Sequence, residues 1–416
     1  MLTIPTAYAQ MGLVSAILWQ VFVAVSGSWT SFLLNSIYLD YRKRMNEAGY
    51  KRSNHVLQYH ELMSVYLGKW GGYLTLAINI LALGSLGVVQ IIACASDIHI
   101  LAPGLNKRDW ALIFGGASCL TILIPTLHNY RVWSFLGLVA TTYTSWFLVG
   151  AAVNHGVVHD VQRPSHTSLQ NWFLGSSNLL FAYGGHSLSI EVMEGMWRPS
   201  TFSWIYPLAV TYTQTLTMPN AITLHQIYGS QLLKNSNSLA VVPASAARDV
   251  SIILMIMHQA VAYGLFVTPL YFMWEKAIGT HRKSLWIRLP SRIPVCLFIW
   301  FIALLVPFFG PINSVMGAFF TTWASYIIPG IAYIWAFRKK EARDNAPKPP
   351  PSFLARSWKL AFAISLFIGS ILFVFGFGFG AWASILSLKQ NGDTFGAFAA
   401  CYQCTTPKAA PAPHAG

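Results

Sequence analysis

The chain has 416 residues, of which 55% are hydrophobic and only 10% are charged. Soluble globular domains carry about 25% charged residues, so this composition excludes a soluble protein. The formal net charge of +14 could suggest a nucleic-acid partner. The basic residues, however, lie in separate short stretches between apolar runs, which topology and contact with anionic lipid explain better.

Four long runs contain no Asp, Glu, Lys or Arg: residues 70–96, 199–233, 293–337 and 360–388. A membrane-spanning helix needs about 20 apolar residues. This length rule predicts an all-α polytopic membrane protein with a partial first span at residues 1–12 and ten full spans after it. Their expected centres are Val25, Leu83, Gly116, Ser145, Tyr183, Thr215, Val261, Ile302, Ser325 and Phe373.

The segments outside these spans are short. Residues 1–337 form the predicted transporter core. Residues 338–357, which contain "KKEARDNAPKPPPSF", are predicted to form a stiff Pro-rich cytoplasmic linker. Residues 358–388 form an eleventh span, and 389–416 a tail that ends in a small, Pro-rich, disordered stretch. Because no soluble segment is large enough for a separate activity, we expect a transporter and not an enzyme.

The distribution of Lys and Arg between alternate loops predicts the orientation. One set of loops holds 20 of the 27 basic residues. The other set holds Lys107, Arg108, Arg163, Lys234, Arg248, Lys389 and Lys408. Since cytoplasmic loops carry the excess of Lys and Arg, we expect the first set to be cytoplasmic and the C-terminus to be extracellular.

The five cysteines fall into two groups. Cys94, Cys119 and Cys296 lie in apolar runs, where a free thiol usually packs as a small hydrophobic group. "CYQC" places Cys401 and Cys404 in the tail, where a local disulfide is plausible. Zinc is not expected there, because the sequence offers no second ligand pair.

The stretch "FAYGGHSLSIEVMEGMW" at 181–197 interrupts the sixth span. Tandem glycines lower helix propensity by about 1 kcal/mol each, so Gly184 and Gly185 predict an unwound segment, which is tolerated at membrane depth where it lines a polar cavity. The half-helix after the break would point its free N–H groups at a carboxylate. His186 at its edge suits proton coupling, with a structural hydrogen bond to a carbonyl group as the alternative.

Other polar residues inside the spans have two interpretations each. Glu191 and Glu194 share a helix face, and either line the pathway or pair with Arg198 at the helix end, which we favour for Glu194. Asp97 is either an exposed carboxylate near the membrane boundary or a proton-coupling group.

The eighth and tenth spans hold further candidates. His258 and Gln259 either face the site or hydrogen-bond between helices. Asn313 either faces the site or satisfies backbone groups freed by Pro311.

The two interrupted segments suggest an architecture. Many carriers consist of two inverted five-helix repeats whose first helices are broken and meet around the substrate. Pro5, in the first span, and Gly184–Gly185, in the sixth, fall at corresponding positions. We therefore expect five plus five spans and one extra, with an incomplete first helix and a substrate site between the first and sixth spans.

At these residues the chain closely resembles the plant AUX/LAX auxin influx carriers of the amino acid/auxin permease family. The similarity runs nearly from Leu2 to Cys404. It includes "GSWTSFLLNSIYLDYR", "QIIACASDI", "HNYRVWSFLGL", "YGGHSLSIEVMEGMW", "TPLYFMWEKAIG", "PFFGPINSVMGA", "FGFGFGAWAS" and "DTFGAFAACYQC".

The resemblance implies proton-driven uptake of indole-3-acetic acid across the plasma membrane by a LeuT-like fold, with the proton as coupling ion and no cofactor. Carried over by position, the resemblance implies that the region around Tyr183, Gly184, Gly185 and His186 contacts auxin or its coupled proton. Together with the candidates from the spans themselves, the expected substrate-binding residues are Pro5, Tyr8, Tyr183, Gly184, Gly185, His186, Gln259 and Asn313. From the residues themselves, the expected proton-coupling groups are His186, Glu191 and Asp97. Tyr8, Tyr183, Phe266 and Phe309 could provide aromatic walls for the indole ring.

Two departures from the family pattern leave alternatives open. The chain begins at the "LTIPTAYAQ" match, without the N-terminal segment and first half-helix that we expect in the family. Asp97 stands where we expect an asparagine, so an altered proton or substrate preference is one interpretation. The alternatives to auxin import are an amino-acid/proton symporter of the same fold and a non-transporting membrane protein.

Overall fold

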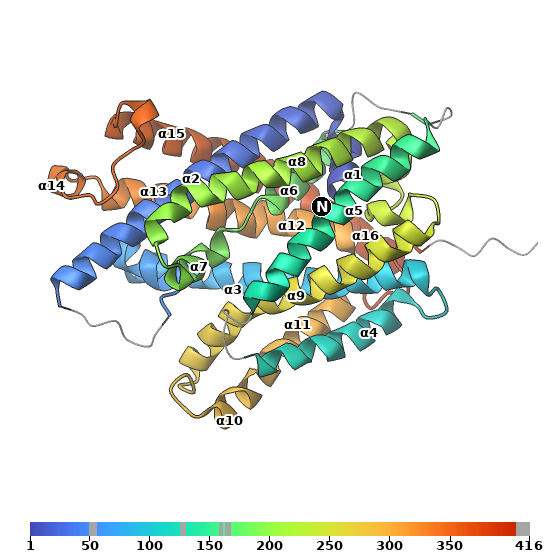
Figure 1. Ribbon diagram of the computed structural model, residues 1–416, viewed down its shortest axis with the longest axis horizontal. Coiled ribbons are helices and arrows are strands. Elements are labelled where there is room, and N and C mark those ends of the chain that lie inside the picture. Colours follow the sequence, from blue (N-terminus) through green and yellow to red (C-terminus); the bar gives the residue numbers. More distant parts are fainter. Residues whose placement is uncertain (50–55, 125–129, 158–160, 163–167, 405–416) are drawn as a thin grey trace, which may run out of the picture.

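The computed structural model describes residues 1–49, 56–124, 130–157, 161–162 and 168–404. Within these ranges every regular element is a helix, and seven helical segments are long and apolar enough to cross a membrane (Figure 1). The prediction of an all-α polytopic membrane protein is therefore confirmed. The remaining stretches, which include Lys51, Arg52, Arg163 and the tail beyond Cys404, lie outside the described residues.

The helices follow one another as the apolar runs predict. They are α1 (Ile4–Met11), α2 (Leu13–Glu47), α3 (Tyr59–Leu101), α4 (Lys107–Ser118), α5 (Arg131–His155), α6 (Leu169–Ala182), α7 (Ser189–Gly195), α8 (Phe202–Tyr228), α9 (Ala246–Ala277), α10 (Leu285–Arg288), α11 (Ile293–Leu305), α12 (Phe309–Val315), α13 (Ile328–Ala336), α14 (Lys340–Asp344), α15 (Trp358–Ile371) and α16 (Gly380–Phe395). Two π-helical stretches, η8 (Met316–Ile327) and η10 (Leu372–Phe379), join α12 to α13 and α15 to α16. Nine of the ten expected span centres lie within these helices, and the tenth, Tyr183, lies at a break.

The first helix is short and is separated from the second by one glycine. Gly12 adopts φ 81°, a left-handed conformation that favours glycine, and α2 begins at the next residue. Pro5 occupies the first turn of α1, where the missing N–H costs no hydrogen bond. α1 packs against α6 and α8, so it lies beside the first half of the interrupted sixth span.

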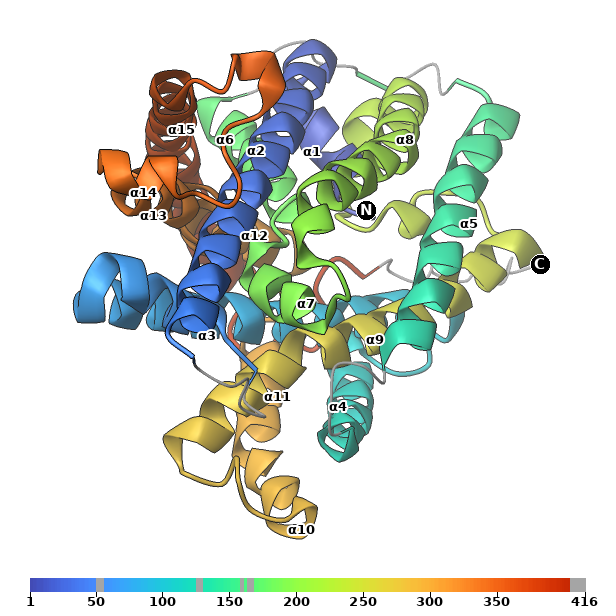
Figure 2. The same ribbon diagram turned by 60° about the vertical axis from the view of Figure 1, so that its left-hand side comes forward.

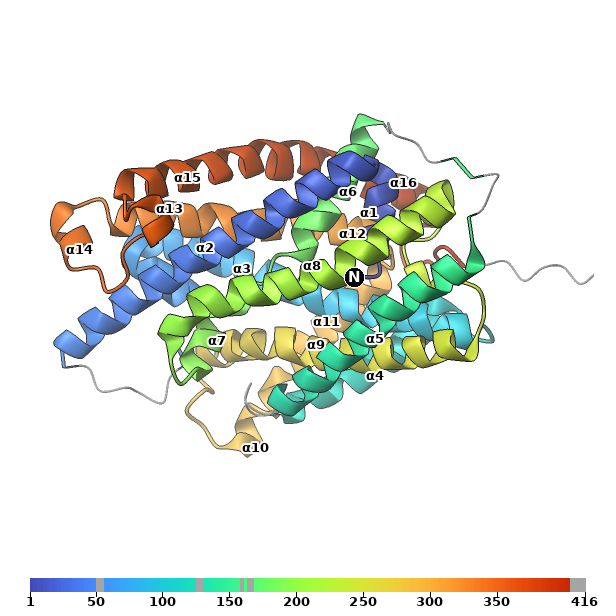
Figure 3. The same ribbon diagram turned by 45° about the horizontal axis from the view of Figure 1, so that its top comes forward.

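The helices surround two groups of buried apolar side chains. One lies among α1, α2, α6, η8, α13 and α15, and the other among α3, α9, α11 and α12. α2 and α8 run side by side across one face (Figure 3). α4, α10 and α11 lie on the opposite side of the bundle from α14 and α15 (Figure 2). Tyr183 belongs to the first group and Leu188 to the second, so the break of the sixth span lies between them.

α6 and η8 touch through their main chains. A Cβ atom at Gly317 of η8 would approach the carbonyl oxygen of Ser177, on α6, to 1.8 Å. A Cβ atom at Gly380, where α16 begins, would come within 2.6 Å of the Ser177 hydroxyl. Three helices therefore meet around one serine, with no room for another methyl group. The inverted-repeat relation between the two halves of the chain stays a prediction.

Two of the five cysteines are not the free thiols that the sequence predicted. Cys119, just after α4, forms a disulfide with Cys296 of α11, across a sequence separation of 177. The interpretation of both as free thiols was wrong, because nothing local in the sequence shows that α4 and α11 are neighbours. Cys94 is buried and free, and Cys401 and Cys404 form the local disulfide that was expected.

The linker and the last span also have a definite structure. Within 338–357 the chain forms α14 and a short turn at Ser352–Leu354, and Lys348 docks onto α2 and α8. The last span runs from Trp358 through η10 to Phe395, beyond the predicted boundary at 388. The linker is therefore attached to the bundle through the side chain of Lys348.

Candidate functional site

The sixth span is broken where the tandem glycines predicted. α6 ends at Ala182 and α7 begins at Ser189. A Cβ atom at Gly184 would lie 2.0 Å from the Thr321 methyl group of η8, so only glycine allows this close approach. Since α7 has seven residues, its dipole is small, and the break acts mainly by exposing polar groups of residues 183–188 inside the bundle.

His186 is fully buried at the break and contacts α2. Its Nε2 atom lies 3.1 Å from the carbonyl oxygen of Gly27 and 3.0 Å from the Thr30 hydroxyl. Because a carbonyl oxygen can only accept, Nε2 carries the hydrogen and donates it. This leaves Nδ1 as the ring nitrogen with a free lone pair.

Tyr206 of α8 approaches His186 from the other side. Its hydroxyl oxygen lies 3.5 Å from Nδ1 of His186 and 3.4 Å from the carbonyl oxygen of Tyr183. The single hydroxyl proton can be donated to only one of these acceptors at a time. The group can therefore exist in two hydrogen-bonded arrangements, which differ in whether Nδ1 is a free acceptor.

A second polar group is centred on Gln20 of α2. Its Nε2 atom lies 2.7 Å from the Tyr183 hydroxyl, and its Oε1 atom accepts a hydrogen bond of 2.7 Å from Tyr8. Gln214 and Thr217 of α8 complete the group, 2.8 and 3.0 Å from Nε2 of Gln20. Three of the expected site residues thus come together. The Tyr183 hydroxyl is linked to Tyr8 through Gln20, and the Tyr183 carbonyl is linked to His186 through the Tyr206 hydroxyl.

Glu191 lies on α7, beyond His186. It is 3% exposed, and in the described part of the chain no side chain donates a hydrogen bond to its carboxylate. The backbone N–H groups of Tyr59, at the start of α3, and of Glu191 itself face the carboxylate. Glu194, one turn later, accepts a hydrogen bond from the hydroxyl of Tyr38 on α2. The two glutamates therefore differ: Glu194 is held by a side chain of α2, and Glu191 is buried without a side-chain donor.

The interpretation of Asp97 as an exposed carboxylate was wrong. It is fully buried, and its two oxygens accept hydrogen bonds from Asn237 at 2.5 Å and from Gln259 at 2.9 Å. The sequence around Asp97 does not predict this burial, because both donors come from segments distant in sequence. Gln259 accordingly lies with Asp97, and no hydrogen bond in the described residues joins it to the break.

The other expected residues lie around these groups. Pro5 is buried in α1, and Asn313 is buried in α12, where its Oδ1 atom has no partner among the described residues. His258 lies against Gly137 of α5, away from the break. Phe309 packs in the apolar group between α3 and α9, with Phe266 at its edge.

A pocket of about 180 Å³ opens at the end of the bundle that carries the tail. Thr3 and Thr6 of α1 and Asn178 of α6 line it, and Tyr402 and Gln403 cover it. Its described lining contains hydroxyl and amide groups and no charged side chain. The pocket is thus bordered by α1 and by α6, the helix that ends at the break.

Sequence reasoning missed several members of the site: Gln20, Thr30, Tyr206, Gln214 and Thr217. Gln20 in "LWQVF" and Gln214 in "YTQTL" are amides inside otherwise apolar helices, and that isolation is the one local signal that could have identified them. The hydroxyl groups have no such signal, because Ser, Thr and Tyr are common in these spans.

Comparison with known proteins identifies the family. The model of the family "Transmembrane amino acid transporter protein" matches residues 1–375. The chain is 44% identical over 418 residues to auxin transporter-like protein 4 of Medicago truncatula, covering 100% of this chain and 86% of that protein. It is 44% identical over 408 residues to auxin transporter-like protein 2 of Arabidopsis thaliana, covering 98% and 84%. For auxin transporter protein 1 of Arabidopsis thaliana the identity is 43% over 411 residues, covering 99% and 84%. The chain therefore belongs to the transmembrane amino acid transporter family and, within it, to the AUX/LAX group of auxin transporters.

Proposed function

We propose that the chain is a proton-coupled carrier that imports the auxin indole-3-acetic acid across the plasma membrane, with its C-terminus outside the cell. The observation that supports this most directly is the buried His186 at the broken sixth span, linked through Tyr206 and Tyr183 to the polar group around Gln20. The names of the related proteins supply the substrate class. The excess of Lys and Arg in the opposite set of loops supports the orientation.

His186 can accept a proton without a change in its position. The incoming proton binds Nδ1, the ring nitrogen that holds no hydrogen, while Nε2 keeps its hydrogen bond to Gly27. The Tyr206 hydroxyl then donates to the Tyr183 carbonyl and accepts from Nδ1. Protonation thus changes the hydrogen bonding of the backbone within the break.

The Gln20 group can recognise the substrate. Its amide and phenol groups carry both donors and acceptors, which a carboxyl group and an indole N–H both require. The rings of Tyr8 and Tyr183 supply flat apolar surface beside these polar groups. Because Tyr183 belongs to both groups, a proton on His186 and a substrate at Gln20 influence the same residue.

Uptake of labelled indole-3-acetic acid tests the function. Cells that express the 416-residue chain are compared with empty-vector cells at acidic and neutral external pH, with surface expression measured in parallel. We expect uptake that acid stimulates and that excess unlabelled tryptophan does not reduce. Equal uptake by expressing and empty-vector cells, with the protein confirmed at the surface, would contradict the proposal.

His186→Ala tests the proton-coupling step. We expect this variant to reach the surface and to lose acid-stimulated uptake, because no group remains to take the proton at the break. His258→Ala is the matched control, since His258 lies against α5 and not at the break. Undiminished acid-stimulated uptake by His186→Ala would remove His186 from the mechanism.

A second candidate is an amino-acid/proton symporter. The description of the matched family favours it. The carboxylate of Glu191, buried without a side-chain donor, could pair with a substrate ammonium group. In this case tryptophan or proline would compete with indole-3-acetic acid and would itself accumulate in the cells. The uptake experiment above separates the two candidates.

A further inference from the structure

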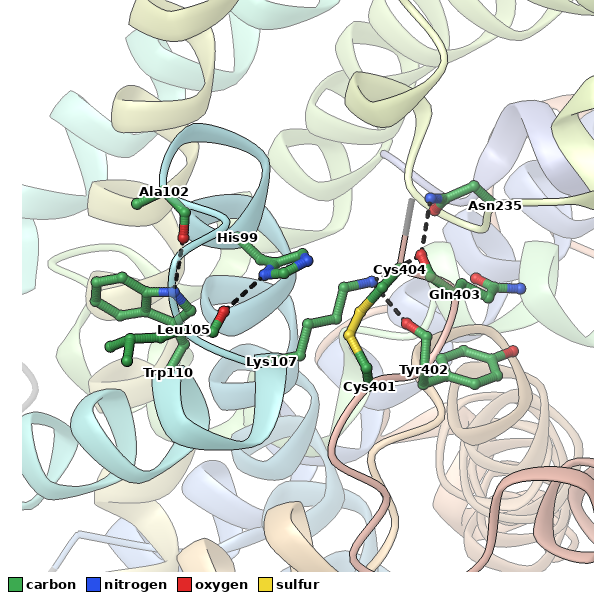
Figure 4. The surroundings of a disulfide bond; sticks show 10 residues. All are labelled: His99, Ala102, Leu105, Lys107, Trp110, Asn235, Cys401, Tyr402, Gln403 and Cys404. Atoms are coloured by element: carbon green, nitrogen blue, oxygen red, sulfur yellow. Dashed lines mark hydrogen bonds between the residues drawn. A yellow bond between two sulfur atoms is a disulfide. The ribbon is translucent and has the colours of Figure 1, made fainter. Parts of the chain in front are cut away.

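Three chemically reactive side chains meet beside the tail, far from the broken span. Cys401 and Cys404 come from the loop after α16, and His99 comes from the last turn of α3. One imidazole nitrogen and the two sulfur atoms lie within 4.8 Å of one another, and all three residues are partly exposed (Figure 4). No local pattern predicts that His99 joins the two cysteines, because about 300 residues separate them in the chain.

The imidazole of His99 is oriented as a metal ligand requires. Nδ1 lies 3.0 Å from the carbonyl oxygen of Leu105, so Nδ1 carries the hydrogen and donates it. Figure 4 shows the other ring nitrogen on the side that faces the cysteines. Histidines that bind metals usually donate their second ring N–H in this way, which fixes the tautomer and the ring orientation.

The loop that carries the cysteines has anchors besides its disulfide. The Lys107 ammonium group lies 2.7 Å from the carbonyl oxygen of Tyr402 and 3.1 Å from that of Gln403. The side chain of Gln403 accepts a hydrogen bond from the backbone of Ser236, and the ring of Tyr402 packs on Phe308. Reduction of the disulfide would therefore leave both sulfur atoms close to His99.

We propose that the reduced form of this cluster binds one Zn²⁺ ion through Cys401, Cys404 and His99. Two molecules of a small thiol reduce the disulfide, yielding two protein thiols and one small-molecule disulfide. The ion then replaces the two thiol protons, which pass to water, and accepts the lone pair of the imidazole. Water completes the tetrahedral geometry that Zn²⁺ prefers. The Lys107 cation nearby favours the thiolate forms, and the two thiolates balance the charge of the ion.

This inference does not depend on what the carrier transports. It makes the tail a site with two exclusive states, disulfide or metal complex. The expectation against zinc considered only neighbouring sequence, where the Cys-x-x-Cys pair stands alone. The fold supplies the missing ligand from α3.

Metal analysis of the purified full-length chain in detergent tests the proposal. Protein reduced with a metal-free phosphine is incubated with Zn²⁺ alone, desalted under nitrogen and analysed for metal. We expect one Zn²⁺ per chain in reduced protein and none in oxidised protein. Zn²⁺ should also slow alkylation of Cys401 and Cys404, measured by mass spectrometry, which requires no variant.

Variants assign the ligands. Cys401→Ser with Cys404→Ser should abolish binding, and His99→Ala should weaken it at least about tenfold. Cys119→Ser with Cys296→Ser is the control, because that pair lies within the bundle and should not change the stoichiometry. Reduced wild-type protein that binds no more Zn²⁺ than the Cys401/Cys404 variant would overturn the proposal, as would unchanged affinity in His99→Ala.

Discussion

Two buried carboxylates at opposite ends of the bundle are held in different ways. Asp97, at the end that carries the tail, accepts one amide hydrogen bond on each oxygen. Glu191, on the other side of the break, has no side-chain donor among the described residues and faces the backbone N–H groups of Tyr59 and of Glu191 itself. A buried charge is tolerable when donors surround it and costly when they are absent. Asp97 therefore resembles a structural group, whereas Glu191 resembles a group that changes partners during transport.

The surroundings of Asp97 would also accept a neutral amide. The Oε1 atom of Gln259 has no partner in the described residues, so rotation of this side-chain amide would present an acceptor where it now presents a donor. An asparagine at position 97 could then accept from Asn237 and donate to Gln259. This explains how the same site could hold the asparagine that we expect in the AUX/LAX family.

The largest expected effect comes from Glu191→Gln. The amide has nearly the same shape and carries no charge, so the fold should be kept, but it cannot release a proton. We expect acid-stimulated uptake of labelled indole-3-acetic acid to fall to the level of empty-vector cells. The matched control is Glu194→Gln, which lies on the same helix and is held by Tyr38. Full acid stimulation in Glu191→Gln would show that Glu191, like Asp97, is not needed for proton coupling.

Asp97 should instead affect stability. Asp97→Ala leaves the amides of Asn237 and Gln259 without an acceptor, at a cost of roughly 1–3 kcal/mol for each. Asp97→Asn should recover most of this loss through rotation of the Gln259 amide, and should keep acid-stimulated uptake. Thermal unfolding in detergent measures the first effect and uptake the second. Loss of acid stimulation in Asp97→Asn would instead make Asp97 a proton-coupling residue.

Lys348 offers a third way to hold a charge away from water, with a smaller expected effect. Its ammonium group lies 2.8 Å from Asn35 Oδ1 and 2.9 Å from the carbonyl oxygen of Ser200, and it also contacts the Ser203 hydroxyl. Burial lowers the pKa of Lys348 from 10.5 to about 8.

This lowered pKa predicts a pH dependence with a definite sign. Between pH 8 and 10.5 the unfolded chain binds more protons at Lys348 than the folded chain does, so the free energy of unfolding should rise with pH across this window. The Lys348→Gln variant should not show this rise in the free energy of unfolding between pH 8 and 10.5. Melting temperatures of both proteins, measured from pH 7 to 11 in one detergent, provide the test. Identical pH profiles would show that the linker holds Lys348 less firmly than its contacts indicate.

Local patterns predicted the spans and the break because both depend on short sequence windows. Charge-free runs located the helices, and Gly184–Gly185 located the break. The partners across helices could not be predicted in this way. His186 was identified, but Gly27, Thr30 and Tyr206, which determine its tautomer, come from α2 and α8. The same reason explains the Cys119–Cys296 bond and the two amides around Asp97.

The contact of Gly317 with Ser177 has a consequence for motion. Two helices whose main chains touch cannot slide or tilt independently without a steric clash. We therefore expect α6 and η8 to move as one rigid body. Any hinge of the sixth span is then confined to the residues between Ala182 and Ser189. A covalent cross-link from α6 to η8 is expected to leave uptake intact, whereas one from α6 to α7 should stop it.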